Sequence, residues 1–163
     1  MWAPCRHEGC SADSEVEAAA VARLVRRLLT GTFTDSDGVT RPMTPADVLV
    51  VAPFNAHVAR LCAVLPPGVR AGTVDKFQGR QAPVVIYSMA SSTAQTAPRG
   101  VGFLFDIHRL NVAISRAKAL AIVVASPALL DASVSTPEQL RAVNALCRYV
   151  EQAREVDVAA VLG

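Results

Sequence analysis

Four short runs rich in apolar residues alternate with segments in which apolar side chains recur every three to four positions. Short apolar runs of this kind are typical of strands covered on both faces, as in a parallel sheet. Strands that alternate with helices indicate an α/β layer fold with a mostly parallel sheet. The expected strands are residues 47–52, 69–74, 84–89 and 120–125, and the expected helices begin near residues 14, 55, 109 and 136.

Two helix starts carry the same local pattern, a capping box. Ser14 is followed by Glu17, and Thr136 is followed by Gln139. In a capping box the hydroxyl accepts from an N–H of the first turn, and the later side chain bonds back to the capping residue. Pro137 suits the first position of its helix. We therefore expect Glu17 to satisfy a free N–H group at the start of its own helix.

The 163 residues are enough for one domain, which we expect to occupy residues 14–155. Residues 1–13 show no periodic pattern and are expected to be irregular. Residues 31–46 contain turn residues and two prolines, which predict a loop. Residues 156–163 are expected to form a tail.

A very polar segment separates the second and third expected strands. In parallel α/β sheets, ligands bind in the crevice beyond the carboxyl ends of the strands. Residues 75–81 follow such an end, so we expect their polar side chains to face a ligand.

Composition narrows the class of protein only slightly. Hydrophobic residues make up 52% of the chain and charged residues 18%, which is enough for a packed core. The net charge of +2 permits a local patch for nucleic acid but does not argue for one. No apolar run approaches the ~20 residues that a membrane helix needs, so no membrane contact is expected. The four cysteines are interpreted as reduced thiols of a cytoplasmic protein.

Three N-terminal residues, Cys5, His7 and Cys10, resemble a fragment of a metal site. A zinc site needs four ligands at workable spacing, and no second Cys or His pair accompanies these three. A plain loop is the favoured interpretation and no metal site is expected. A small zinc-binding protein is kept as the weakest alternative.

Three segments carry polar residues directly after a strand or along a helix: Ala52–His57, Gly72–Gln81 and Arg109–Lys118. In this order and spacing, "APFNAH", "GTVDKFQGRQ" and "RLNVAISRAK" resemble motifs IV, V and VI of superfamily 1 helicases. The match is to the second RecA-like domain of the branch that includes the nonsense-decay helicases, and it covers about residues 17–150. It implies a RecA-like three-layer sandwich. The segment "YSMASSTAQTAPRGVGFLF" is similar to bacterial proteins that fuse such a helicase to a RecB-like nuclease, and the Ala-rich, Arg-rich composition also suggests a bacterial source.

The resemblance implies a set of nucleotide contacts. Arg116 matches an arginine finger that reaches the γ-phosphate of ATP bound to another domain, a catalytic role. A surface ion pair is the alternative, which the motif disfavours. Gly79, Gln81 and Arg109 match further ATP-binding positions. The family usually has Glu where Gln81 stands, and Arg109 fits equally well with a phosphate site or with an ion pair to Asp106.

The resemblance also implies contacts to a single strand and residues that couple the strand to the nucleotide. A plain strand-end turn is the alternative for Thr73 and Asp75. His57 stands where the family commonly has Gln, and it is interpreted as a satisfied residue without a catalytic role. The expected nucleic-acid or coupling residues are Pro53, Phe54, Asn55, Thr73, Asp75 and Gln78.

Neither lysine of the chain lies in the G-x-x-x-x-G-K-[ST] sequence of a P-loop. ATP and Mg²⁺ are therefore expected to be bound mainly by a first RecA-like domain, and this chain is expected to be inactive alone. The favoured interpretation is the C-terminal motor half of an ATP-dependent DNA or RNA helicase. Its expected partners are single-stranded nucleic acid, the first RecA-like domain and a RecB-like nuclease domain. The alternative is a non-catalytic, truncated helicase-like module that binds single strands or a protein.

Overall fold

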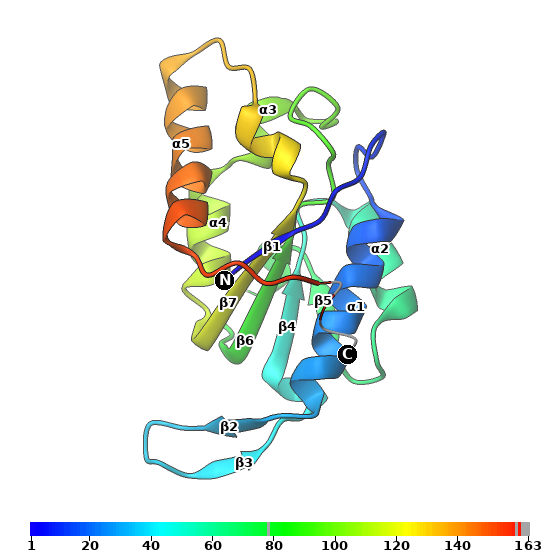
Figure 1. Cartoon of the computed structure of the whole chain (residues 1–163), viewed down its shortest axis with the longest axis vertical. Helices are drawn as coiled ribbons and strands as arrows, with labels where there is room; N and C mark the ends of the chain where they lie inside the picture. Colours follow the sequence, from blue (N-terminus) through cyan, green and yellow to red (C-terminus); the bar gives the residue numbers. More distant parts are fainter. Residues whose placement is uncertain (78, 159, 161–163) are drawn as a thin grey trace.

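The centre of the protein is a sheet of parallel strands (Figure 1). The computed structural model describes residues 1–77, 79–158 and 160. The sheet has five strands in the order β1-β7-β6-β4-β5, and every neighbouring pair is parallel. The strands are β1 (Trp2–Pro4), β4 (Val48–Val51), β5 (Arg70–Gly72), β6 (Ala82–Ser88) and β7 (Ala117–Ala125). The predicted α/β fold with a mostly parallel sheet is confirmed.

Helices cover both faces of this sheet (Figure 1). One face carries α1 (Glu15–Leu29) and α2 (Asn55–Val64), and the other carries α3 (Gly100–Leu104), α4 (Ile107–Ile114) and α5 (Pro137–Gln152). Strand β6 is buried along its whole length, and its side chains alternate between the two cores. Val85 and Tyr87 pack under α4 and α5, whereas Val84 and Ile86 pack under α1. The result is the expected three-layer sandwich. No helix among the described residues is long and apolar enough to cross a bilayer.

The N-terminal segment departs from the prediction, because part of residues 1–13 is regular. Residues Trp2–Pro4 form β1, which pairs in parallel with β7 at the edge of the sheet. The far side of β1 is also paired: the Trp2 N–H donates to the Arg154 carbonyl (2.9 Å) and the Val156 N–H donates to the Trp2 carbonyl (2.8 Å). A three-residue strand is too short for a periodic pattern, and its partners lie more than a hundred residues away in the sequence.

Residues 31–46 also differ from the expected loop. They form an antiparallel hairpin of β2 (Thr32–Thr34) and β3 (Thr40–Pro42), which projects beyond the end of the sheet at which β4 begins (Figure 1). Asp47 holds the base of this hairpin. Its carboxylate accepts from both Arg41 Nη atoms (2.6 and 2.7 Å) and from the Thr44 N–H (2.8 Å). The bonds from Arg41 hold the pKa of Asp47 well below its usual range.

We expect Asp47→Asn to lower the free energy of unfolding at pH 7 by about 2 kcal/mol, because hydrogen bonds to a charged, buried carboxylate are stronger than neutral ones. Urea unfolding followed by circular dichroism measures this change. Asp37→Asn, at an exposed position in the hairpin turn, is the matched control and should change stability by less than about 0.5 kcal/mol. Equal effects of the two substitutions would contradict the role given to Asp47.

Candidate nucleotide and nucleic-acid site

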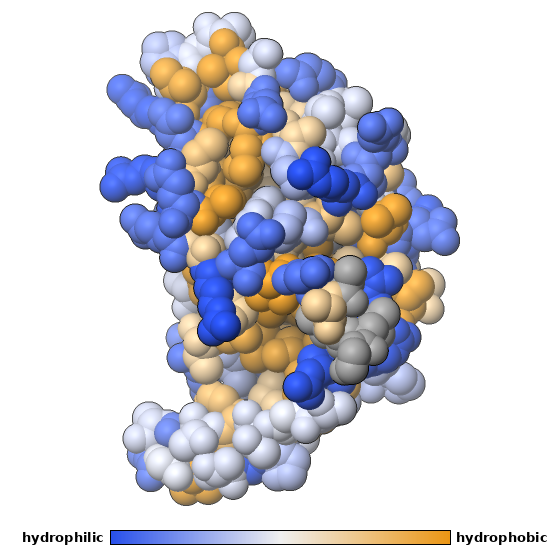
Figure 2. Space-filling model, in the orientation of Figure 1, coloured by the Kyte–Doolittle hydropathy of each residue, from blue (hydrophilic) through white to orange (hydrophobic). Residues whose placement is uncertain are grey.

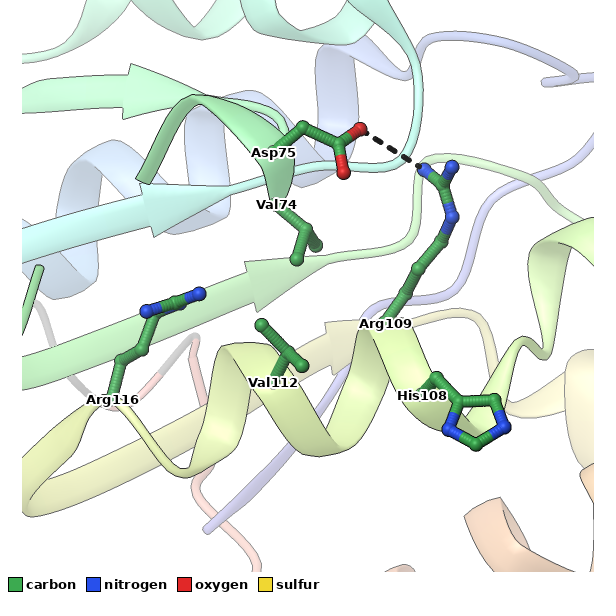
Figure 3. Close-up of a pocket in the computed structure, with 6 residues that line it drawn as sticks. All are labelled: Val74, Asp75, His108, Arg109, Val112 and Arg116. Atoms are coloured by element: carbon green, nitrogen blue, oxygen red, sulfur yellow. Dashed lines mark ion pairs between the residues drawn. The ribbon is translucent and has the colours of Figure 1, made fainter. Parts of the chain in front are cut away.

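An open groove of about 260 Å³ runs between α4 and the segment that follows β5. Arg109, Val112 and Arg116 lie three and four residues apart, so they share one side of α4 and of the turn that follows it. Figure 3 shows the two arginines at opposite ends of the groove, with apolar side chains facing each other between them. The lining residues are Val74, Asp75, His108, Arg109, Val112 and Arg116. The groove therefore has an apolar middle and a guanidinium at each end.

Arg116 lies in a turn, which corrects the expectation that it stands on a helix. Helix α4 ends at Ile114, and Ala117 already belongs to β7, where it pairs with Ala82 of β6. The Ala82 N–H donates to the Arg116 carbonyl (3.1 Å), which ties the turn to the start of β6. Pairing of Ala117 with β6 thus ends the helix at Ile114, although the apolar pattern in the sequence continues beyond this residue.

The Arg116 side chain has few partners in the protein. Its Nη1 donates to the Arg80 carbonyl (3.3 Å), and its buried Nε has no hydrogen-bond partner among the residues that the structure describes. Within the part of the chain that the structure describes, no carboxylate forms an ion pair with this guanidinium. A partly buried cation with unused donors at the mouth of a groove can receive an anion.

Arg109 is held at the other end of the groove by several contacts. It lies 3.6 Å from the Asp106 carboxylate and 3.9 Å from that of Asp75, the pair drawn in Figure 3. Its guanidinium also stacks on the Phe103 ring, 4.6 Å from the centroid. Asp106 caps α4 by accepting from the His108 N–H (2.9 Å) and the Arg109 N–H (3.2 Å). The ion pair expected as one alternative for Arg109 is confirmed, and a phosphate contact stays a prediction.

Comparison with known proteins now fixes the family. A family model described as an AAA domain matches residues 5–128. The chain belongs to this AAA-domain family. The regulator of nonsense transcripts 1 homolog of Drosophila melanogaster is 32% identical over 123 residues, which are 75% of this chain and 10% of that protein. The DNA polymerase alpha-associated DNA helicase A of Schizosaccharomyces pombe is 44% identical over 75 residues, 44% of this chain and 11% of that protein.

A third relative is the DNA replication ATP-dependent helicase/nuclease of Arabidopsis thaliana. It is 29% identical over 120 residues, 73% of this chain and 8% of that protein. The AAA domain thus spans about a tenth of the length of these relatives. Family and relatives identify it as a domain of the superfamily 1 helicase type. These relatives are eukaryotic and give no support to a bacterial source, and the likeness to RecB-like nuclease fusions stays a prediction.

The segment after β5 does not present all its predicted residues to one crevice. Thr73 and Asp75 lie just past the carboxyl end of β5, where Asp75 begins a short 3₁₀ helix, η2 (Asp75–Phe77). Gln81 directly precedes β6 and lies beside the amino ends of the strands. There it lines a different hollow of about 670 Å³, together with the hairpin and Lys118. The chain has to cross the sheet between parallel strands, so the expectation of a single crevice is wrong for Gln81.

The middle of this segment carries two further predicted residues. Gln78 lies outside the described residues. Gly79 has a φ of +77°, a left-handed conformation that favours glycine. No described atom lies within 4 Å of where a Cβ would stand, so the turn accounts for the glycine, and the ATP contact at Gly79 stays a prediction.

The predicted strand-binding segment lies at the carboxyl end of β4, where α2 begins. Pro53 and Phe54 are buried, and Asn55 is exposed. The Phe54 ring packs against Phe103, with centroids 5.5 Å apart. Phe54 is therefore part of the core, and its side chain offers no face to a base.

Arg99 and Phe103 complete this edge, and the sequence analysis did not single them out. The Arg99 guanidinium lies 4.2 Å from the centroid of the Phe103 ring, which also carries Arg109. Phe103 thus has guanidinium groups from both Arg99 and Arg109 against its ring. The sequence feature that could have pointed to these two residues is the closeness of arginine and aromatic residues in the segment before motif VI.

His57 is satisfied inside the AAA domain, as expected. It is completely buried; its Nδ1 accepts from the Ser14 N–H (3.3 Å) and its Nε2 faces Ser88 Oγ (2.8 Å). Burial is the largest influence on its pKa, which is lowered. Among the described residues no group of three or more possible metal ligands occurs, around His7 or elsewhere. Burial raises the pKa of the Cys5 thiol to about 11.

We expect the free energy of unfolding to fall as the pH drops below about 6.5, the ordinary pKa of His. Because the pKa of His57 is lowered in the folded protein, the unfolded chain binds the proton more readily. The stabilisation is therefore complete above this pH and is lost as the pH falls toward the folded pKa, by up to about 1.4 kcal/mol per unit. Urea unfolding at about pH 7.5 and about pH 5.5 measures the loss. His57→Gln should reduce this pH dependence, and an unchanged dependence would contradict a neutral His57.

Proposed function

We propose that this domain is the second RecA-like half of an ATP-dependent superfamily 1 helicase, with Arg116 as its arginine finger. The observation that carries the proposal is the environment of the Arg116 guanidinium: it lines an open groove, and among the described residues its one hydrogen bond is to a backbone carbonyl. A residue that served only the fold would be expected to pair with a carboxylate. Arginine suits phosphate recognition because it stays charged and can donate two parallel bonds.

The residues of the groove are suited to the phosphates of ATP but not to its magnesium ion. Arg116 and Arg109 are cations suited to the phosphates. The described residues contain no cluster of carboxylates that could hold a metal, and the sequence lacks a P-loop. We therefore assign the magnesium and most of the ATP contacts to a first RecA-like domain, in the same or another polypeptide. When bound there, ATP supplies the phosphoryl group whose transfer to water drives the motor.

In this proposal each end of the groove has its own task. Arg116 stabilises charge on the terminal phosphate, a contribution worth roughly 10³–10⁵ in rate for comparable fingers. Arg109 lies 3.9 Å from the Asp75 carboxylate, so the start of α4 lies beside the segment that begins at Thr73. Closure and opening of the two domains around the nucleotide would shift this segment and any strand on it.

The strand-binding surface is assigned to the carboxyl edge of the sheet. Asn55, Thr73 and Asp75 supply polar groups near this edge, and Arg99 and Phe103 add a cation stacked on a ring. Such a surface suits the backbone and bases of a single strand of DNA or RNA without reading sequence. The likeness to nuclease fusions extends the proposal to a RecB-like nuclease as a partner domain.

A second candidate function is a non-catalytic helicase-like module. It is supported by Gln81, which is neutral where the family usually has Glu, and which lines the hollow beside the hairpin. Such a module would bind single strands or a protein partner and would show no turnover when a first RecA-like domain is supplied.

We expect Arg116→Ala to lower the strand-stimulated ATPase rate of the complete two-domain enzyme by roughly 10³-fold or more, because charge on the terminal phosphate loses its stabilising group. Arg116→Lys should restore little activity, since an ammonium group cannot form the two-pronged contact. Arg141→Ala, at an exposed position on α5, is the control and should leave the rate unchanged. If the Arg116→Ala enzyme still hydrolyses ATP at the wild-type rate, Arg116 is not an arginine finger. If the wild-type two-domain enzyme hydrolyses no ATP, the non-catalytic module is favoured.

We expect this chain to bind fluorescein-labelled oligo(dT) or oligo(rU) without ATP, and Arg99→Glu to weaken binding about tenfold, because it reverses a charge beside the stacking ring. Fluorescence anisotropy measures the Kd, and comparison of the two probes decides between DNA and RNA. Arg148→Glu makes the same charge change on the exposed side of α5 and is the matched control. Equal weakening by both substitutions would contradict a defined surface at Phe103.

A further inference from the structure

A buried carboxylate far from the groove has no part in the function proposed above. Glu17 of α1 is completely buried. Its carboxylate accepts from His7 Nε2 (2.8 Å), from Ser88 Oγ (2.6 Å) and from the Ala90 N–H (2.9 Å). A charge in this position is tolerable only because several donors compensate for the lost water.

This role of Glu17 replaces the one expected from its capping box. Ser14 does cap α1, since its Oγ accepts from the Glu17 N–H (3.1 Å). Glu17 does not bond back to the Ser14 N–H, which instead donates to His57 Nδ1 (3.3 Å). The side chain is thus free to point inward and to accept from three donors, one in the N-terminal segment and two where the chain leaves β6.

The bonds form one continuous network with a fixed direction. Because Nδ1 of His57 accepts, its Nε2–H is the donor to Ser88 Oγ, and the Ser88 hydroxyl then donates to Glu17. On the other side the Nδ1 of His7 faces Ser92 Oγ (2.7 Å), which also accepts from the Cys10 N–H (2.9 Å). A carboxylate can only accept, so Glu17 sets the direction of every donor around it.

One of these bonds holds a strained turn. Ala90 has a φ of 67°, the only left-handed conformation of a non-glycine residue among the described residues. Such a conformation persists only when surrounding contacts hold it in place. The bond from the Ala90 N–H to Glu17 does so where the chain leaves β6 for the loop that carries Arg99 and Phe103.

The other arm of the network ends at the start of α2. His57 lies two residues after Asn55, and the Phe54 ring of the same segment packs on Phe103. Glu17 therefore holds together the start of α2 and the loop after β6, the two segments that frame the proposed strand surface.

Catalysis by this network is excluded by burial. Ser92, His7 and Glu17 are connected in the order of a hydrolase triad. Ser92 is only 2% exposed, and the His7 side chain is also 2% exposed, so no substrate could reach the hydroxyl.

We infer that Glu17 is a positioning residue for single-strand binding: through Ser88, His57 and Ala90 it fixes Asn55 relative to the Arg99–Phe103 pair. The inference rests on the function proposed above, because it assumes that this edge of the sheet binds a strand. It adds to that function a buried residue that touches neither strand nor nucleotide.

The test uses the Glu17→Gln variant of this chain. An amide has one acceptor oxygen and one NH₂ group, so either the bonds from Ser88 and Ala90 are lost, or the bond to His7 is lost or reversed in direction; in each case the network no longer has its native directions. We expect the Kd for labelled oligo(dT) or oligo(rU) to rise about tenfold and hydrogen exchange of the Ala90 amide to accelerate about tenfold or more. Ser88→Ala removes the link between His57 and Glu17 while the bonds from His7 and Ala90 to the carboxylate remain, and it should raise the Kd in the same direction.

Two controls separate positioning from general loss of stability. Glu15→Gln changes an exposed carboxylate on the same helix, whose side chain is 88% exposed, and should alter neither measurement. Ile86→Val lowers the stability of the buried strand β6 without touching the network, and it should leave the Kd unchanged. An increase in Kd with Ile86→Val equal to that with Glu17→Gln would overturn the inference.

The outcomes distinguish this inference from the function on which it rests. If the wild-type chain binds neither oligonucleotide, the proposed strand surface is wrong and the inference falls with it. If the wild type binds and both Glu17→Gln and Ser88→Ala bind equally well, Glu17 is only structural, while the helicase proposal stands.

Discussion

The pairing of β6 with β7 determines where the two arginines of the groove lie. Ala82 pairs with Ala117, and the Ala82 N–H binds the carbonyl of Arg116. Because the two strands are parallel, α4 must return from the carboxyl edge to the amino edge before β7 can start. This return path separates Arg109 from Arg116 by the length of a short helix. The groove, with a cation at each end, is a direct consequence.

Periodicity predicted the three inner strands β4, β6 and β7 well, because each buries apolar side chains on both faces of the sheet and so has a run of apolar residues in the sequence, and it also predicted the short edge strand β5. It failed where pairing with distant residues decides the structure. Strand β1 contains three residues, and its regularity comes from β7 and from the segment near Val156. Helix α4 stops at Ile114 although the apolar pattern continues, because the sheet captures the chain at Ala117. Local propensity gives way in both places to tertiary contacts.

The candidate site was predicted in part, and its errors have the same cause. The motifs predicted that Asp75, Arg109 and Arg116 belong to one site, and the three residues do line one groove. Their positions follow from the end of a strand and the length of one helix, which the sequence indicates. The motifs could not show that Gln81 lines a different hollow, beside the hairpin, because that depends on how the chain crosses the sheet. Glu17 was misassigned for a further reason. A capping box is a local pattern, whereas the donors that hold this carboxylate come from residues 7, 88 and 90.

In the proposed helicase, communication between Arg116 and the proposed strand surface needs a rigid connection. The Arg109–Asp75 ion pair is a weak candidate, because it is 3.9 Å long and the Asp75 side chain is 76% exposed. Exposed pairs of this kind contribute about 0–1 kcal/mol. The buried connections are stronger: β6 runs from the Arg116 turn at one edge to Ser88 at the other, inside two packed cores. Glu17 holds the far end of that strand, so displacement at Arg116 would be transmitted along β6 and not across the groove.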